Sequence, residues 1–461
     1  MLENYTIAAI STPLGAGGIG IVRMSGEDSF TIANKIFEGK NKKDVKDYKS
    51  HTIHYGKIVD PKTQEVIDEV LLSILKGPHT YTKENMIEIN CHGGLIVVQK
   101  ILQLVLREGA QLAEPGEFTK RAFLNGRIDL SQAEAVIDVI NAQTELALQS
   151  SVSQLGGGLS EKVKVFRQEL LEMIAHIEAS IDYPEHDMEE LTYEMIQTNT
   201  EQLLEKVNDF IQTADTGRMI KEGIQTVIIG KPNVGKSSLL NALLREQRAI
   251  VTNIPGTTRD ILEEYVNIQG VPLKIVDTAG IRQTEDVVEQ IGVEKSKGSI
   301  PQADLILVMM DASTPWAEED HDIFELIQGK QVLVLINKTD LPRQLDIDLV
   351  TEYVPLDSIL EISIKEKIGL DLLEKTLKEM FFKGEIKMNE TIFITNVRHK
   401  DALVKSKESL ETVLETIELG LPEDCLSIDL QSAYEYLGEI TGETVGESLI
   451  DQIFSQFCLG K

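Results

Sequence analysis

The chain has few cysteines and no long hydrophobic run, and each shortage excludes a class of protein. Three cysteines in 461 residues are too few for a disulfide framework, and their spacing suits no metal site. We expect Cys91 and Cys425 to be small core residues. No apolar stretch approaches the roughly 18 residues that a membrane helix requires, and no basic stretch followed by an apolar core opens the chain. We therefore predict a cytoplasmic protein that does not enter membranes.

Positive charge is also scarce. Lysine and arginine number 45 against 75 aspartate and glutamate residues, which gives a formal net charge of −30. A protein that binds nucleic acid by itself is usually basic, because it must neutralise phosphates. If this chain has an RNA partner, we expect another protein, or a local basic patch, to hold most of it. The length predicts about three domains, and a hydrophobic content of 42% is ample for their cores.

A phosphate-binding loop is the first positive feature. Gly230–Ser237 fits G-x-x-x-x-G-K-[ST] at every fixed position. The β-branched run Thr226–Ile229 precedes it and the helix-like run Ser238–Leu244 follows it, and this context makes a chance glycine turn a poor alternative. We predict that Lys236 reaches the β- and γ-phosphates and that Ser237 binds Mg²⁺. The predicted loop contacts to nucleotide are Asn233, Val234, Gly235, Lys236, Ser237 and Ser238.

Two further motifs follow buried-strand patterns and identify the nucleotide. After Leu273–Val276 come Asp277, which we expect to hold the Mg²⁺ water shell, then Thr278, Ala279 and Gly280, whose backbone N–H faces the γ-phosphate. After Val332–Ile336 come Asn337, Lys338, Thr339 and Asp340. The Asp340 carboxylate can accept two hydrogen bonds from guanine, which adenine does not offer, so the motif favours GTP. Ser363, after another strand-like run, is predicted to complete the base pocket.

Two positions set this nucleotide site apart. Ile281 follows the Asp277–Gly280 motif where Ras-like GTPases carry a glutamine that orients water, so a carboxylate within Thr284–Glu289 is a candidate for that task. Asn233 lies where negative charge grows during cleavage, and its amide oxygen could bind a monovalent cation together with the first switch, Thr252–Asp260. Asn233 could equally serve only to cap a turn, and the residues leave both interpretations open.

The rest of the chain divides by hydrophobic period. Strand-like runs at 6–10, 19–24, 70–75 and 86–91 predict a strand-rich α+β domain over residues 1–118, with Glu88 on the face opposite Ile87, Ile89 and Cys91. Helical spacing begins near residue 119, where Ser131–Glu134 is typical of a capping box.

Two apolar stripes, one at Val163, Phe166, Leu170, Ile174, Ile177 and Ile181 and one at Leu403, Leu410, Leu414 and Ile417, flank the nucleotide-binding part. Neither stripe can stay exposed, so the helices before and after this part should pack together. This predicts a helical domain in two segments, 119–217 and 384–461, with a doubly wound P-loop GTPase domain, 218–383, inserted between them.

Over its whole length the chain resembles the MnmE (TrmE) family of tRNA modification GTPases. The resemblance rests on the GTPase motifs together with Thr12–Arg23, Cys91–Gly94, Pro115–Arg127, Gly256–Asp260 and the terminal Cys458–Lys461. It implies a homodimer joined through an N-terminal tetrahydrofolate-binding domain. It also implies a heterotetramer with the flavin-dependent protein MnmG, which together with this chain modifies the wobble uridine of certain tRNAs at carbon 5, using 5-formyl- or methylene-tetrahydrofolate.

The resemblance also assigns roles by motif. It implies K⁺ ligands at Asn233, Thr252, Ile254 and Thr257, and Mg²⁺ ligands at Ser237 and Thr258, with Thr252, Thr257 and Thr258 also contacting GTP. Glu289 matches the glutamate that orients water, which answers the question raised by Ile281. Folate contacts are implied at Arg23, Glu88, Arg127 and Lys461, and Cys458 matches a cysteine important for modification. Lys231 stands where relatives often have arginine.

Two alternatives remain at this point. A ribosome-assembly or translation switch would share the GTPase motifs, although such proteins usually carry a basic RNA-binding domain. A folate enzyme with a regulatory GTPase domain is the other. The tail also has two interpretations, because Cys458 is either a functional thiol or a cysteine without a role. We expect the terminal carboxylate and the Lys461 ammonium to be free to enter a neighbouring site.

Overall fold

A computed structural model describes residues 5–40, 43–182, 189–246, 264–268, 271–276, 299–381 and 392–461. Its contacts divide the chain into two compact units, and each is built from several separate segments. The first unit contains residues 1–137, 155–168 and 434–461, and the second contains 138–154 and 169–433. Within the described residues, no helix is long and apolar enough to cross a membrane.

The first unit is built around a seven-stranded sheet with the strand order β3-β4-β5-β6-β2-β1-β7. Neighbouring strands are antiparallel except β1 and β7. The four predicted strand runs are confirmed as β1, β2, β5 and β6. The strands are β1 (Ile7–Ile10), β2 (Gly17–Ser25), β3 (Phe37–Gly39), β4 (Thr52–Val59), β5 (Val66–Leu75), β6 (Met86–Gly93) and β7 (Gln111–Leu112).

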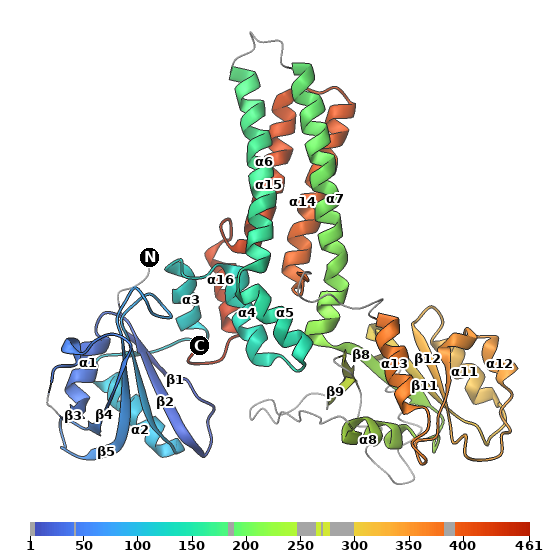
Figure 1. The fold of residues 1–461 in the computed structure, drawn as a ribbon, viewed down its shortest axis with the longest axis horizontal. Helices are drawn as coiled ribbons and strands as arrows, with labels where there is room; N and C mark the ends of the chain where they lie inside the picture. The colour runs from blue at the N-terminus through green and yellow to red at the C-terminus, as the bar shows by residue number, and fades with distance from the viewer. Residues whose placement is uncertain are drawn as a thin grey trace. The chain divides into compact units, whose positions relative to one another are not determined.

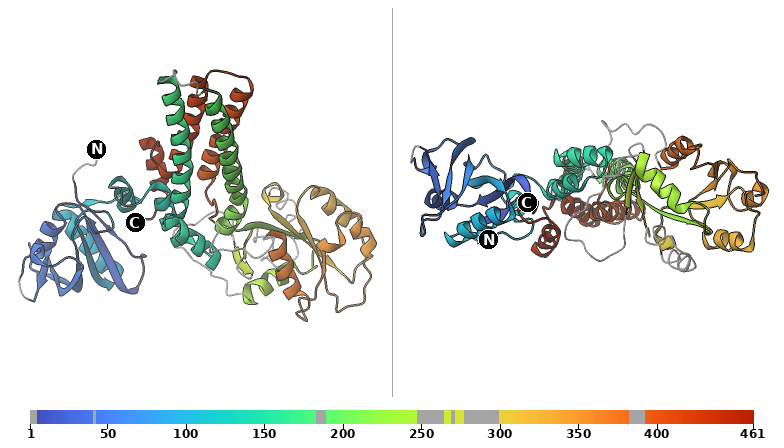
Figure 2. Two further views of the ribbon diagram at one scale, coloured as in Figure 1. Left: turned by 45° about the horizontal axis from the view of Figure 1, so that its top comes forward. Right: turned by 90° about the horizontal axis from the view of Figure 1, so that it is seen from below.

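Helices α1 (Ser29–Ile36) and α2 (Leu95–Arg107) cover one face of this sheet (Figures 1 and 2). Their apolar stripes meet the alternating inward side chains of the strands, so that Ile32, Ile101, Val22 and Leu72 share one core. Ile87, Ile89 and Cys91 are buried while Glu88 is only half-buried, which confirms the predicted alternation along β6. The other face of the sheet carries Glu88.

Helices α3 (Glu117–Leu124) and α16 (Glu447–Ser455) pack with the start of α4 (Leu130–Asn141) in the same unit. The predicted capping box is displaced by two residues. Asp129, not Ser131, caps α4: its carboxylate accepts the Gln132 backbone N–H, and the Gln132 side chain accepts the Asp129 backbone N–H. Aspartate before a helix competes well for this role because its carboxylate also suits the helix dipole.

Long helices from both sides of the nucleotide-binding part run side by side, largely within the second unit (Figure 1). They are α6 (Gly158–Asp182), α7 (Glu189–Glu222), α14 (Val397–Glu418) and α15 (Glu423–Thr441), with α5 (Glu145–Leu155) near the base of α7. Lys407 of α14 donates to Asn208 of α7, and Thr200 of α7 donates to the Met173 sulfur of α6. The prediction that helices before and after the nucleotide-binding part pack together is confirmed by the contact of α7 with α14, although Ile181, at the end of the first stripe, is exposed.

The second sheet has six strands in the order β13-β12-β11-β8-β10-β9. All neighbours are parallel except β9 and β10. Because β8 lies between β10 and β11, the chain turns both ways from it, as in a doubly wound fold, and this confirms the predicted class. The strands are β8 (Ile224–Gly230), β9 (Glu264–Ile268), β10 (Val271–Ile275), β11 (Leu305–Asp311), β12 (Val332–Asn337) and β13 (Ile359–Glu361).

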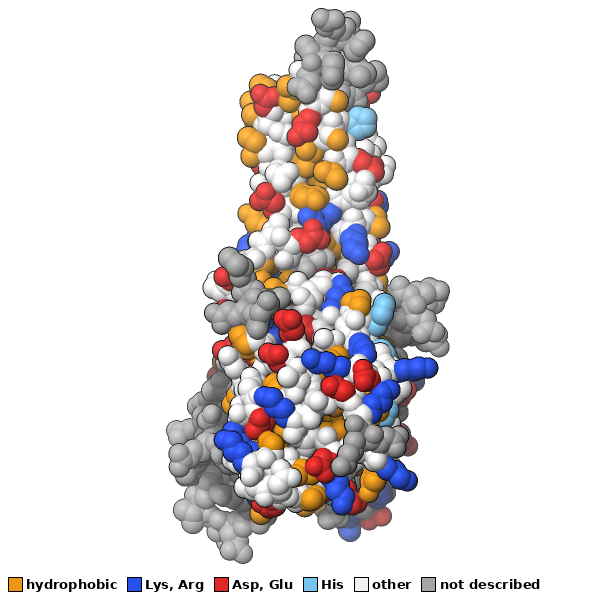
Figure 3. Space-filling model, turned by 90° about the vertical axis from the view of Figure 1, so that its left-hand side faces the viewer, with side chains coloured by type: hydrophobic (Ala, Val, Ile, Leu, Met, Phe, Trp, Pro, Cys, Tyr) orange, Lys and Arg blue, Asp and Glu red, His pale blue; other side chains and the backbone are white. Residues whose placement is uncertain are grey.

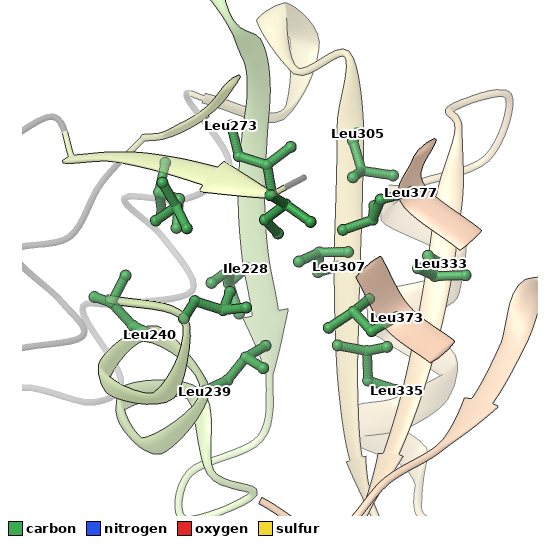
Figure 4. Close-up of a cluster of buried hydrophobic side chains, with 14 of the residues drawn as sticks. Ile228, Leu239, Leu240, Leu273, Leu305, Leu307, Leu333, Leu335, Leu373 and Leu377 are labelled. Carbon is green, nitrogen blue, oxygen red and sulfur yellow. The ribbon is translucent and has the colours of Figure 1, made fainter. Parts of the chain in front are cut away.

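Helices cover both faces of this sheet, so its strands read as continuous apolar runs. On one face, α8 (Lys236–Glu246) and α13 (Leu370–Phe381) bury Leu239, Leu240, Leu373 and Leu377 against the strands (Figure 4). On the other face, α11 (Glu318–Leu326) contributes Phe324. The short helix α12 (Ile347–Thr351) follows β12.

Helix α7 leads directly into the sheet. A single residue, Gly223 with φ +85°, separates the end of α7 from the start of β8. Arg218 in the last turns of α7 pairs with Asp304, which immediately precedes β11, at 2.7 Å. The same Asp304 carboxylate accepts the Gln225 backbone N–H at 3.0 Å. The 34-residue helix is therefore tied to the strand that carries the phosphate loop.

Candidate functional site

The phosphate loop occupies the switch point of the second sheet. Strand β8 ends at Gly230 and α8 begins at Lys236, which confirms the strand, loop and helix predicted around the motif. Gly230 (φ +147°), Asn233 (φ +63°) and Gly235 (φ +109°) adopt backbone conformations that ordinary residues avoid. A Cβ on Gly235 would lie 2.4 Å from the Asn337 Nδ2, so only glycine fits there. Asparagine tolerates a positive φ better than most residues, so the backbone conformation alone can account for an asparagine at position 233.

The side chain of Lys236 folds back over the loop. Its ammonium donates hydrogen bonds to the Gly230 carbonyl at 2.8 Å and to the Lys231 carbonyl at 2.7 Å. Ser237 and Ser238 occupy the first turn of α8, where the exposed backbone N–H groups and the helix dipole favour an anion. Positive charge and backbone donors thus converge at the carboxyl end of β8.

Asn337 connects the base-binding motif to the phosphate loop. It ends β12, is buried, and donates from Nδ2 to the Val234 carbonyl at 2.8 Å. Its Oδ1 accepts the Ile364 backbone N–H at 3.2 Å. Because β8 and β12 are both parallel to β11, their carboxyl ends meet at one edge of the sheet. One side chain therefore fixes the phosphate loop and the two base-binding loops relative to each other.

Asp340 and Ser363 meet as the sequence predicts. The Ser363 hydroxyl donates to Asp340 Oδ1 at 2.7 Å, and this hydrogen bond holds the pKa of Asp340 below its ordinary value. Asp340 is therefore an ionised acceptor near neutral pH. Thr339 donates to the Ile362 carbonyl and links the same two loops. Such a carboxylate suits the paired donors of a guanine ring.

Several predicted site residues lie outside the described residues. They are Thr252, Ile254, Thr257, Thr258, Asp277, Thr278, Ala279, Gly280 and Glu289. Their assignments to Mg²⁺, K⁺, GTP and the water-orienting step stay predictions.

A second candidate site lies on the sheet of the first unit. Arg23 of β2 and Glu88 of β6 are directly opposite in the strand register, and the guanidinium pairs with the carboxylate at 2.8 and 2.9 Å. The Phe118 ring lies 5.7 Å from the Arg23 guanidinium carbon. Arg127 lies 4.7 Å from the centre of the Tyr81 ring. The structure thus brings Arg23 and Glu88 into contact, while Arg127 contacts an aromatic ring instead.

The chain terminus contacts this second site. The Gly460 carbonyl accepts hydrogen bonds from Arg23 Nη1 at 3.2 Å and from the Ser11 hydroxyl at 3.0 Å. The Lys461 backbone oxygen accepts the Phe118 N–H at 3.2 Å, so the predicted free terminal carboxylate is wrong. The tail is held because Gly460, with φ +85°, packs its backbone against Ile10. The side chain of Cys458, in the same tail, is exposed.

Comparison with known proteins places the chain in a family. The model of the MnmE helical domain matches residues 130–458, and the model of the GTP-binding protein TrmE N-terminus matches residues 6–127. The chain is 54% identical over 456 residues to the tRNA modification GTPase MnmE of Thermoanaerobacter pseudethanolicus, which covers 99% of both chains. It belongs to the MnmE family. The tRNA modification GTPase MnmE of Oceanobacillus iheyensis is 51% identical over 462 residues, covering 100% of both chains.

As a member of the MnmE family, the chain is a GTP hydrolase of the tRNA modification class. Among solved structures, the chain is 34% identical to an Aquifex aeolicus Era crystal structure bound to GDP·AlF₄⁻. That match covers 40% of this chain and 66% of the other, at a TM-score of 0.27.

Two ion pairs at the nucleotide site, each with a buried carboxylate, were missed by the sequence reasoning. Lys338, within the base motif, pairs with Asp311 at the end of β11 at 2.6 Å. Burial works to raise the pKa of Asp311, but hydrogen bonds from Lys338 and Ser313 outweigh it, so the pKa is lowered. The sequence signal that could have identified Asp311 is a carboxylate at the end of a buried apolar run. The second pair joins Lys231 to Asp320, and no motif marks Asp320.

The cysteines follow the sequence prediction in part. Cys91 is a buried core residue, and burial raises its pKa to about 11. Cys425 was expected in a core but is only partly buried on α15, so that prediction is wrong. A helix position beside the apolar stripe, rather than within it, accounts for the difference.

Proposed function

We propose that this chain is a K⁺-activated GTPase that acts with MnmG on the wobble uridine of certain tRNAs. In this proposal the pair adds a carboxymethylaminomethyl-type group at carbon 5, with the one-carbon unit supplied by 5-formyl- or methylene-tetrahydrofolate. The observation that carries the GTPase part is the convergence of Lys236, Asn337 and Asp340 at one sheet edge. The wobble-uridine chemistry rests on family membership.

The phosphate loop supplies electrostatic help for cleavage. Lys236 is within reach of the loop interior, where it would neutralise charge that develops on the β- and γ-phosphates. Asp340 would hold the guanine ring, and Asn337 would keep the base and phosphate loops in register. We assign Glu289 to orienting the attacking water, and Asp277 with Thr278, Ala279 and Gly280 to sensing the γ-phosphate.

The donor set at the loop fits the two cations that the proposal needs. Ser237 presents a hydroxyl at the first turn of α8, a ligand position suited to Mg²⁺, and Asn233 presents an amide on the exposed rim of the loop. We assign Mg²⁺ to Ser237 and Thr258, and K⁺ to Asn233, Thr252, Ile254 and Thr257. When bound, these ions supply positive charge beside the bond that breaks.

The Arg23–Glu88 pair supports a folate site. The Glu88 carboxylate is half-buried and rigidly held by Arg23, and such a group can accept the paired N–H donors of a pterin ring. Arg127 and Lys461 carry the positive charge that the glutamate tail of folate requires. We propose Cys458 as a catalytic thiol because the tail that carries it is fastened to Arg23 through Gly460.

Exposed apolar side chains on the first unit support a homodimer. Ile53, Tyr55 and Leu71 are exposed on the paired strands β4 and β5, and a neighbouring protomer would bury them.

Figure 3 shows Lys and Arg side chains interspersed with Asp and Glu over the visible face, not gathered into a field of one sign. With a net charge of −30, the chain alone is a poor polyanion binder, so we assign most tRNA contacts to MnmG. We propose that this complex works in the cytoplasm.

The decisive experiment is nucleoside analysis of total tRNA from a deletion strain. We expect the carbon-5 wobble modification to be absent, the wild-type gene to restore it, and Lys236→Ala to fail because it no longer binds GTP. A matched control, Lys164→Ala on the exposed face of α6, should restore it fully. Intact modification together with accumulated ribosomal precursors would support a ribosome-assembly switch instead. Intact modification with altered folate pools would support a folate enzyme.

A further inference from the structure

Asp320 contacts the phosphate loop although it belongs to no nucleotide-binding motif. It lies in the first turn of α11, and its side chain is only 4% exposed. Its Oδ2 accepts a hydrogen bond from the Lys231 ammonium at 2.6 Å and another from the Ala317 backbone N–H at 3.0 Å. The carboxylate therefore joins the loop to the beginning of a helix on the sheet.

This ion pair is well shielded from water. The Lys231 side chain is 18% exposed and that of Asp320 is 4% exposed, so water has little access to either charge. A buried charge is tolerated only when a partner compensates it, and removing either partner leaves the other uncompensated. The pair thus holds the position of Lys231 strongly, whereas an exposed pair would hold it weakly.

The position of Lys231 in turn determines where the Lys236 ammonium is held. Its backbone carbonyl accepts the Lys236 ammonium at 2.7 Å, while its side chain is held by Asp320. At the other end of the loop, Asn337 holds the Val234 carbonyl at 2.8 Å. The loop therefore has two side-chain anchors. Asn337 is part of a nucleotide-binding motif, and Asp320 is not.

We propose that Asp320 is a positioning residue for GTP, which acts by holding Lys231 and hence the first turn of the phosphate loop. The inference rests on GTP binding at this loop. Because the loop contacts the phosphates of GDP and GTP alike, loss of the anchor weakens both nucleotides. The effect falls on binding more than on the chemical step, since both ground state and transition state use the same loop.

The structure provides an internal reporter for this contact. Trp316, the single tryptophan of the chain, precedes Ala317, whose N–H the Asp320 carboxylate accepts. The indole stacks with Phe324 at 5.6 Å and with Tyr353 at 5.7 Å between ring centres. A nucleotide that shifts Lys231 thus changes the surroundings of the indole through Asp320.

The test compares Asp320→Asn, Lys231→Met, the double variant and Lys231→Arg in the full-length protein. We expect each of the first two to weaken GDP and GTP binding about tenfold, with kcat at saturating GTP within threefold of wild type. The double variant should be no weaker than either single one, because the charges act as a unit. Lys231→Arg should bind within twofold of wild type. The control is Glu319→Gln, which removes an exposed carboxylate from the same turn of α11.

Tryptophan emission supplies the second measurement. GDP should change the emission of wild type and of Glu319→Gln, and this change should be lost in Asp320→Asn. Affinities of both single variants within twofold of wild type would overturn the proposal, as would losses that multiply in the double variant. If a single variant does not fold, the double variant, which leaves no unpaired charge, decides by the same affinity measurement. Failure of wild type to bind GTP would instead refute the function of the loop.

Discussion

Replacing Asn337 with alanine tests how the base and phosphate loops are held together. The substitution removes the donor to the Val234 carbonyl and the acceptor for the Ile364 N–H, both at a buried position. A buried polar group left without a partner costs about 1–3 kcal/mol. The Val234 carbonyl is such a group and the Ile364 N–H is partly buried, so with partial relaxation of the backbone we expect a loss of about 3 kcal/mol.

The loss of stability in Asn337→Ala should be measurable before any nucleotide is added. For a domain of roughly 150 residues, each kcal/mol lowers the melting temperature by about 2–4 °C, so we expect a decrease of about 6–12 °C. Thermal unfolding of nucleotide-free protein, followed by Trp316 emission, reports on this part of the chain because the protein has no other tryptophan. Asn241→Ala, on the exposed side of α8, is the matched control and should shift the midpoint little.

The comparison separates two roles for Asn337. If the residue only touches the bound base, nucleotide-free Asn337→Ala will melt within 2 °C of wild type, and the reasoning from the two hydrogen bonds is refuted. If it ties the loops, the melting temperature falls without nucleotide, and the affinity for GDP falls with it.

Other expected outcomes concern the chemistry of the site. Asp340→Asn should shift preference from guanine to xanthine nucleotides in competition binding, because the amide then donates where the carboxylate accepted. Glu289→Ala should leave the GTP affinity unchanged and slow single-turnover hydrolysis at least tenfold. Hydrolysis should be faster in K⁺ than in Na⁺ at equal ionic strength, and equal rates would remove the proposed cation. Below pH 9, a thiol reagent should label the exposed Cys458 rapidly and spare Cys91, because a pKa of about 11 keeps the buried Cys91 thiol protonated. Mass spectrometry of peptides identifies the labelled cysteine.

Local patterns in the sequence were sufficient for much of the fold. The phosphate loop, its strand and its helix follow from one motif and its flanks, because glycine conformations and strand periodicity are local properties. The alternation around Glu88 correctly assigned the faces of β6. The start of α4 was misplaced because aspartate and serine compete as caps within three residues, and only the hydrogen bonds decide between Asp129 and Ser131.

Contacts between distant segments were beyond local patterns. Lys231 and Asp320 are 89 residues apart, and only the packing of α11 on the sheet brings them together. The tail behaves likewise: a mobile terminus is the ordinary expectation for the last residues of a chain, but Gly460 contacts Arg23 across 437 positions. The fold of the nucleotide site was thus predictable from its motifs, while the ion pair of Lys231 with Asp320 was not.

Because α7 passes through Gly223 directly into β8, a tilt of α7 at the sheet would be enlarged along the helix. At 1.5 Å per residue, the 34 residues of α7 form a rod about 50 Å long. A tilt of about 5° at its foot would move its far tip by roughly 4 Å, which exceeds the length of a hydrogen bond. A displacement too small to disturb the sheet would therefore become, at the distant end of the bundle, a motion large enough to make or break a docking contact.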